Sequence, residues 1–279
     1  MNRMPIINFD EKFADFTSAW LKEHRDEYRN YDDMEADMPR MYLSFLNTRA
    51  DWLDGVTPGA YFTQFEDPKD LVDWLRAYCE EGTPVPELLL EQITNVGRPC
   101  EKRLLELLKD EESPEEARMT AVGLLRDLGS ELPRMLYIQW QMARGEKDEL
   151  KDNALESLTE MGKSVVQPIL QNIQAANSAG QEALLEVLSH FPGDERITRL
   201  AMKLFREKPE KRALLAGYLG RIGDPMALPL LEEAAAERDL RYLTFIEIRN
   251  AIEALGGDCP EREFDEDPEY DALRELDGN

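Results

Sequence analysis

Only two histidines, His24 and His190, are available for imidazole chemistry in this chain of 279 residues. They lie in different parts of the chain, and neither belongs to an H-E-x-x-H motif or to another spacing of paired metal ligands. Acidic side chains are plentiful, but no spacing separates a general acid from a general base. The sequence therefore predicts no metal site, no cofactor and no enzymatic activity.

One short segment resembles a phosphate-binding loop but lacks a required residue. Met161-Gly162-Lys163-Ser164 matches the end of such a loop, whereas Ser157 occupies the position that needs a glycine. No strand is indicated before it. Gly162 is better explained as a turn between two helices.

The three cysteines, Cys79, Cys100 and Cys259, contain no C-x-x-C pair. Their number and spacing favour free or buried thiols over a disulfide framework. Cys79 is predicted near a helix C-terminus, where the helix dipole raises the pKa of a thiol. We therefore do not expect a reactive nucleophile there.

Basic and amide side chains recur at corresponding positions of successive predicted helices. The candidate partner-binding residues are Arg103, Arg134, Gln171, Arg199, Lys203 and Arg206. Arginine can pair a carboxylate through two parallel hydrogen bonds. Two interpretations stay open: an ordinary solvated face, or a groove that captures an acidic peptide.

Six glycines recur at intervals of 30 to 33 residues, each between two apolar segments with a helical period: Gly97, Gly129, Gly162, Gly193, Gly223 and Gly256. Glycine commonly ends a helix because it tolerates the left-handed conformation. The spacing predicts an array of helical pairs, with turns at these glycines.

Apolar residues occupy matching positions in each pair. The first helix keeps them four and one residues before the glycine, and the second helix seven, eight and eleven residues after it. This register predicts that Leu170 faces the core. Ser113-Pro114-Glu115-Glu116 predicts a helix start with Ser113 as N-cap.

The segment from Arg212 to Glu232, which contains L-G-R-I-G-D and A-L-P-L-L, resembles a bacterial HEAT-like repeat of the kind also seen in phycobilin lyases. The resemblance covers roughly residues 84–257. It implies an all-α fold, a right-handed α-solenoid of about five HEAT-like hairpins, whose second helices line the concave side. Family members are mostly binding scaffolds.

Three regions are expected: an N-terminal helical capping module at 1–82, the repeats at 83–257 and an acidic tail at 258–279. The first is rich in aromatic residues and covers the apolar end of the array. Two outcomes stay open for the tail: a solvated, poorly ordered segment, as is usual for so acidic a stretch, or a short terminal helix that docks on the last repeat through Phe264, Tyr270, Leu273 and Leu276.

The formal net charge of −25 argues against binding to nucleic acid or an anionic membrane. No apolar stretch is long enough to span a membrane, and the first residues do not form a signal peptide. We therefore expect a cytoplasmic, non-enzymatic scaffold that binds a protein or acidic peptide on its concave face.

Two alternatives stay open. The first is a HEAT-like enzyme, either a bilin lyase or a DNA glycosylase that uses Asp127 and Trp140. The second is an antitoxin-like regulator, because the segment from Phe45 to Pro58 faintly resembles an antitoxin signature, although Arg49 and Asp54 depart from it.

Overall fold

The computed structural model describes residues 5–145, 147–259, 261–264, 267–268 and 270, which form helices and loops without a β-strand. The predicted all-α class is confirmed for this part of the chain. Contacts between Cα atoms divide the chain into two compact units, Met1–Pro133 (unit 1) and Arg134–Asn279 (unit 2). None of the helices in the described residues is long and apolar enough to cross a membrane.

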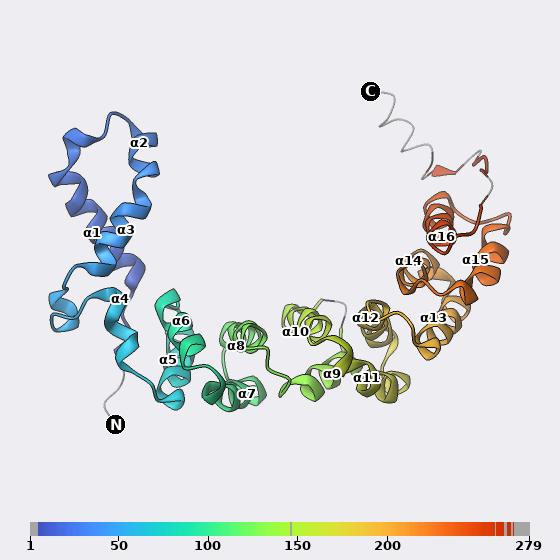
Figure 1. Cartoon of the computed structure of the whole chain (residues 1–279), viewed down its shortest axis with the longest axis horizontal. Coiled ribbons are helices and arrows are strands. Elements are labelled where there is room, and N and C mark those ends of the chain that lie inside the picture. Colours follow the sequence, from blue (N-terminus) through green and yellow to red (C-terminus); the bar gives the residue numbers. More distant parts are fainter. Residues whose placement is uncertain (1–4, 146, 260, 265–266, 269, 271–279) are drawn as a thin grey trace. The chain divides into compact units, whose positions relative to one another are not determined.

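Unit 1 contains eight α-helices in its described residues (Figure 1). They are α1 (Phe9–Glu23), α2 (Tyr31–Ala36), α3 (Met38–Asn47), α4 (Pro58–Tyr61), α5 (Pro68–Glu80), α6 (Glu87–Val96), α7 (Glu101–Lys109) and α8 (Glu115–Asp127). Side chains of Asn8, Asn30 and Asp67 accept hydrogen bonds from free backbone N–H groups at the starts of α1, α2 and α5.

Aromatic side chains, in which this region is rich, form the core of the N-terminal part of unit 1. The ring of Phe9 lies 5.5 Å from those of Trp52 and Phe62, and Phe62 lies 5.1 Å from Trp74 of α5. Helix α5 packs in turn against α6, α7 and α8. The compact unit therefore continues past the expected boundary at residue 82, up to Pro133.

Unit 2 contains eight further α-helices: α9 (Arg134–Met142), α10 (Glu149–Glu160), α11 (Val166–Asn172), α12 (Ser178–Ser189), α13 (Glu195–Glu207), α14 (Arg212–Ile222), α15 (Leu228–Ala235) and α16 (Tyr242–Ala254). The first helices of successive pairs pack on one another, α10 on α12, α12 on α14 and α14 on α16. Close approach is possible because some of these positions are small: a Cβ added to Gly220 would lie 3.1 Å from the Cα of Ala251.

All six recurring glycines have positive φ, between 61° and 95°, as the predicted turns require. The apolar position four residues before each glycine, or five in the pair that carries Pro192, is buried in every pair. These residues are Ile93, Leu125, Leu158, Leu188, Leu219 and Ile252. The turns and this core position are thus confirmed. The second predicted position, next to the glycine, is buried only at Ile222 and Leu255 and is half-buried in the other pairs.

Two local predictions were wrong. Ser113 does not cap α8, because its hydroxyl donates instead to Asp110 and the helix begins only at Glu115. Leu170 is half-buried, whereas its neighbour Ile169 is completely buried. The short helix α11 therefore turns Ile169, rather than Leu170, toward the core.

The described residues after α16 fold back on unit 2. Phe264 is buried, with its ring 5.2 Å from Tyr242 and 5.1 Å from Phe245. Tyr270 lies 4.9 Å from Tyr242. These two aromatic contacts of the tail agree with the docking alternative, and Leu273 and Leu276 lie outside the described residues.

Candidate functional site

The six predicted partner-binding residues are divided between the units. Arg103 lies on α7 of unit 1, and the others lie on α9, α11 and α13 of unit 2, namely Arg134, Gln171, Arg199, Lys203 and Arg206. The structure brings only the last three together, on one exposed face of α13. A continuous strip along both units stays a prediction.

Three of these cations already have a carboxylate beside them on the same helix. Arg103 lies 2.6 Å from Glu106, and Arg199 lies 2.8 Å from Glu195. Lys203 lies 3.9 Å from Glu207. Exposed pairs of this kind contribute little to stability, but they reduce the positive potential that an acidic ligand would meet.

The two rows of helices in unit 2 lie on opposite sides of its curve. Helices α10, α12, α14 and α16 follow the inner side, and α9, α11, α13 and α15 follow the outer side (Figure 1). The resemblance implied the opposite arrangement, with second helices inside. Arg199, Lys203 and Arg206 belong to α13, a helix of the outer row.

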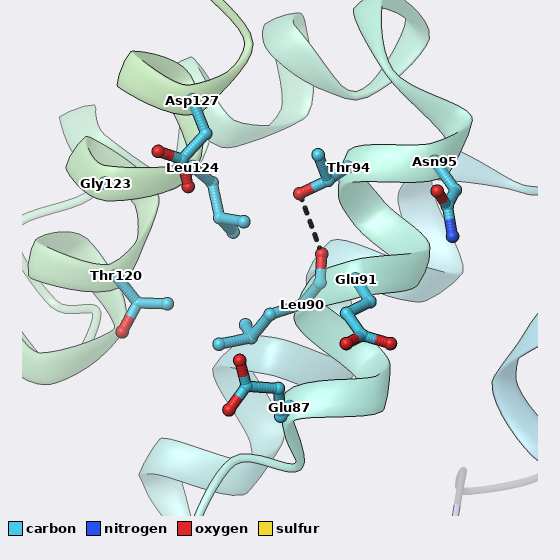
Figure 2. A pocket seen from close by; sticks show the side chains of 9 residues that line it. All are labelled: Glu87, Leu90, Glu91, Thr94, Asn95, Thr120, Gly123, Leu124 and Asp127. Atoms are coloured by element: carbon cyan, nitrogen blue, oxygen red, sulfur yellow. Dashed lines mark hydrogen bonds between the residues drawn. The ribbon is translucent and has the colours of Figure 1, made fainter. Parts of the chain in front are cut away.

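A groove of about 520 Å³ lies between α6 and α8, the first helices of two neighbouring pairs in unit 1. We call it the α6–α8 groove. Figure 2 shows side chains from the two helices extending toward one another across it. Its lining consists of Glu87, Leu90, Glu91, Thr94, Asn95, Thr120, Gly123, Leu124 and Asp127.

The centre of the α6–α8 groove is less polar than its composition suggests. The hydroxyl of Thr94 donates to the carbonyl of Leu90 across 3.0 Å, and that of Thr120 donates to the carbonyl of Glu116 across 2.9 Å. Each hydroxyl is therefore already bonded to its own helix. Leu90 and Leu124 add apolar surface between the two walls.

Gly123 keeps this centre open. It lies in the middle of α8, and a Cβ added there would meet no atom within 4 Å. Helical packing therefore does not require a glycine at this position, although glycine destabilises a helix interior by about 1 kcal/mol relative to alanine. The only local effect of the missing side chain is a wider groove.

The carboxylates of the groove lack cationic partners. Glu87, Glu91 and Asp127 form no ion pair or side-chain hydrogen bond with the described residues, and none of the lining residues is basic. Tyr42 of α3 lies close to two of them. Burial, and then the charges of Glu91 and Glu87, raise the pKa of its phenol.

Buried contacts hold α6 against the rest of unit 1. Leu89 and Ile93 are completely buried, and the side-chain amide of Gln92 donates to the carbonyl of Phe65 across 2.8 Å. Since a buried amide without a partner costs free energy, this bond favours one orientation of α6. It turns Leu90 and Thr94 toward α8.

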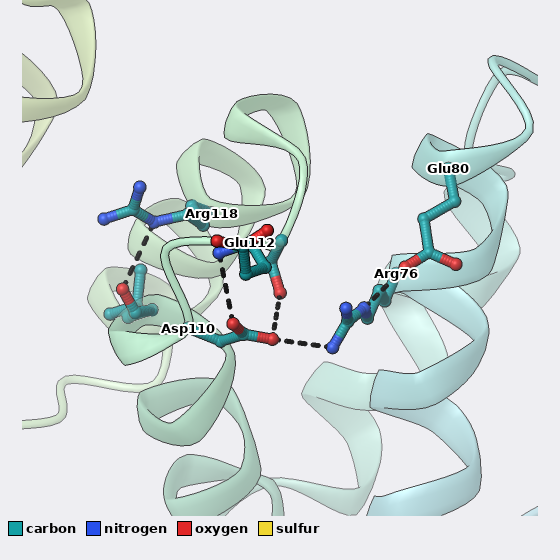
Figure 3. A network of polar contacts seen from close by, with 7 residues as sticks. Arg76, Glu80, Asp110, Glu112 and Arg118 are labelled. Carbon is teal, nitrogen blue, oxygen red and sulfur yellow. Dashed lines mark hydrogen bonds and ion pairs between the residues drawn. The ribbon is translucent and has the colours of Figure 1, made fainter.

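Polar contacts fix α8 relative to α5 and α7 (Figure 3). Arg76 of α5 donates to Asp110, which follows α7, across 2.7 Å and to Glu80 across 2.6 Å. Arg118 of α8 donates to the carbonyl of Leu108 at the end of α7 across 3.2 Å. The wall of the groove that α8 supplies is thereby tied to the helices behind it.

Sequence reasoning missed this groove, although one signal was present. Gly123 and Gly217 each lie six residues before a recurring glycine, inside a predicted helix. Both have free space where a Cβ would be. Glycine recurs at this interior helical position although no neighbouring atom would exclude a Cβ. Such a glycine indicates an open surface.

The other candidate residues have structural contacts. The ring of His24 is stacked on Trp20 at 4.0 Å, and His190 follows α12 with its Nε2 3.2 Å from Arg221. Burial raises the pKa of Cys79 and of Cys100 to about 11. No cluster of possible metal ligands occurs in the described residues.

The two residues considered for a glycosylase do not form a site within either unit. Asp127 belongs to unit 1 and lines the α6–α8 groove, whereas Trp140 belongs to unit 2. The ring of Trp140 lies 5.6 Å from that of Tyr137. Comparison with known proteins yields no matching family, curated protein or solved structure. The HEAT-like resemblance therefore stays a prediction from the residues.

Proposed function

We propose that this chain is a non-enzymatic interaction protein, built as a HEAT-like α-solenoid, that binds a segment of another protein in the α6–α8 groove. The observation that carries the proposal is Gly123, which leaves an open space between two helices where an alanine would fit without contact. The groove volume of about 520 Å³ lies within the usual range of binding sites, roughly 300–1,000 Å³.

The pairing of helices supports the repeat part of the proposal. Successive helices join at glycines of positive φ, and the first helices of neighbouring pairs pack on one another. Such arrays contact partners along rows of equivalent helices. In this proposal the first helices, rather than the predicted second helices, supply the contact.

The test uses the full chain as bait in an extract of the cells that express it naturally, with quantitative mass spectrometry. Gly123→Leu fills the groove, and Gly217→Leu is a matched control at the same repeat position of α14. We expect a partner that is retained by the wild type and Gly217→Leu and depleted with Gly123→Leu. Circular dichroism must show that all baits are equally helical.

A further bait separates the two candidate surfaces. Arg199→Glu combined with Lys203→Glu reverses the charge of the exposed face of α13. The proposal expects this bait to retain the partner. If the charge reversal removes the partner and Gly123→Leu does not, the predicted basic strip is the binding surface and the groove is not.

A further inference from the structure

The three carboxylates of the α6–α8 groove have no cation of the described residues beside them. Some other acidic side chains of this unit do lie beside cations, for example Asp73 beside Lys69 and Asp110 beside Arg76. Glu87, Glu91 and Asp127 have no such partner in the described residues. The groove therefore presents negative charge that the chain itself does not compensate.

The charges lie at the two ends of the groove. Glu87 is the first residue of α6, and Asp127 is the last residue of α8 (Figure 2). Leu90 and Leu124 lie between them, next to the space at Gly123. A ligand that fits this order carries a cation at each end and an apolar side chain in the middle.

The length of the groove limits the spacing of those cations. Ten residues of α6 at a rise of about 1.5 Å each give a wall of roughly 15 Å. An extended peptide advances about 3.3 Å per residue. The two cations are therefore about four residues apart.

The surroundings favour the same ligand. Residues 1–133 contain 29 acidic and 15 basic side chains, so the field of unit 1 attracts cations at longer range. Tyr42 lies near Glu87 and Glu91, where its partly exposed ring can accept a guanidinium on its face. Leu43 beside it is 60% exposed.

We propose that the α6–α8 groove binds an extended basic segment of a partner protein, with two arginines or lysines about four residues apart and an apolar residue between them. This inference rests on the proposed function, and it reverses the charge of the acidic peptide expected from the sequence. Asp127 and Glu87 pair the two cations, and Gly123 admits the apolar side chain.

The experiment selects binders to the full chain from a phage-displayed library of random twelve-residue peptides. The strongest is then measured by fluorescence polarisation. We expect enrichment of lysine or arginine pairs, and loss of binding with Gly123→Leu. Asp127→Asn and Glu87→Gln should each weaken binding roughly 1.4- to fivefold, as expected for one exposed ion pair. Higher salt should weaken binding further.

Glu111→Gln is the matched control, because it removes an exposed carboxylate of unit 1 outside the groove. It should leave the affinity unchanged. If the selected peptides are neutral or acidic and their binding is lost with Gly123→Leu, the inference of a basic ligand is wrong and the proposed function stands. A selection without any peptide sensitive to Gly123→Leu would overturn both. If spermine at an equal concentration displaces a basic peptide, the ligand of the groove is a polyamine and the inferred peptide ligand is wrong.

Discussion

Asp110 Oδ2 accepts a hydrogen bond from Arg76 Nη1 across 2.7 Å, although 34 positions separate the two residues in the chain. The contact joins α5 to the loop between α7 and α8. Asp110 also accepts bonds from the hydroxyl of Ser113 and the backbone N–H of Glu112. One carboxylate thus links three helices behind the α6–α8 groove.

This network predicts a pH dependence. The hydroxyl of Ser113, the N–H of Glu112 and the guanidinium of Arg76 lower the pKa of Asp110 below its ordinary value of 3.8. A depressed pKa in the folded state stabilises the fold above the unfolded pKa, and this contribution is lost as the pH falls through the folded pKa. Arg76→Met should therefore lower the Tm most near neutral pH.

The Tm difference between the wild type and Arg76→Met should shrink as the pH falls below about 4, the ordinary carboxyl pKa of the unfolded chain, toward the lower pKa of Asp110 in the fold. Arg103→Met is the control, because Arg103 and its partner Glu106 are exposed side chains of the same helix. Calorimetric melts between pH 3 and pH 7 check the prediction. A difference for Arg76→Met that does not change with pH would contradict it.

The core register of α11 predicts unequal effects of two adjacent substitutions. Ile169→Ala removes a completely buried side chain, so it should lower the free energy of unfolding by about 2–5 kcal/mol. Leu170→Ala truncates a half-buried one and should cost about 1 kcal/mol. Urea denaturation followed by circular dichroism measures both, and equal costs would show that the register is wrong.

Gly123→Ala should stabilise the chain, because the new methyl group enters free space and alanine favours the helix. The expected gain in the free energy of unfolding is about 0.5–1 kcal/mol. Gly180→Ala is the opposite case, since its Cβ would overlap the carbonyl oxygen of Gln141. Overpacking there should cost about 1–3 kcal/mol. A loss of stability for Gly123→Ala would mean that the position is not open.

The contacts of Arg262 predict how fast the thiol of Cys259 is alkylated. Its guanidinium donates to the carbonyls of Glu237, at 2.5 Å, and Arg238, and it lies over the ring of Phe264. Cys259 is buried, which raises the pKa of its thiol. Arg262→Ala should free the segment and speed alkylation of Cys259 by iodoacetamide several-fold.

Peptide mass spectrometry measures that rate, with Cys100, which is completely buried in unit 1, as the internal reference. Arg262→Lys keeps the charge but loses the planar donor group, so it should give an intermediate rate. If Cys259 reacts equally in all three proteins, Arg262 does not hold the segment in place.

Local patterns predicted most of the helices and turns. The recurring glycines and the buried position before each of them follow from helical period and positive φ, which depend on neighbouring residues only. The failure at Ser113 has a different cause, because its hydroxyl bonds to the carboxylate of Asp110, three residues earlier, instead of to the helix. The position of Asp110 also depends on its bond to Arg76, 34 positions away, and a pairing at that distance has no signature in a single sequence.

The candidate site was harder to predict. The pairing of Arg199 with Glu195 follows from a spacing of four residues on α13, and it could have been found from the sequence. Whether a groove forms between α6 and α8 depends on which helices become neighbours and on how closely they pack. The only sign of the groove in the sequence is Gly123, a residue that is unfavourable inside a helix.

The tryptophans have a consequence for how unfolding can be observed. Trp20, Trp52 and Trp74 belong to unit 1, and Trp140 belongs to unit 2. Emission from the intact protein therefore reports mainly on unit 1, and a fluorescence melt would register little if unit 2 unfolded alone. Trp140→Phe makes the signal specific to unit 1, so that comparison with the total helical signal measures how cooperatively the two halves unfold.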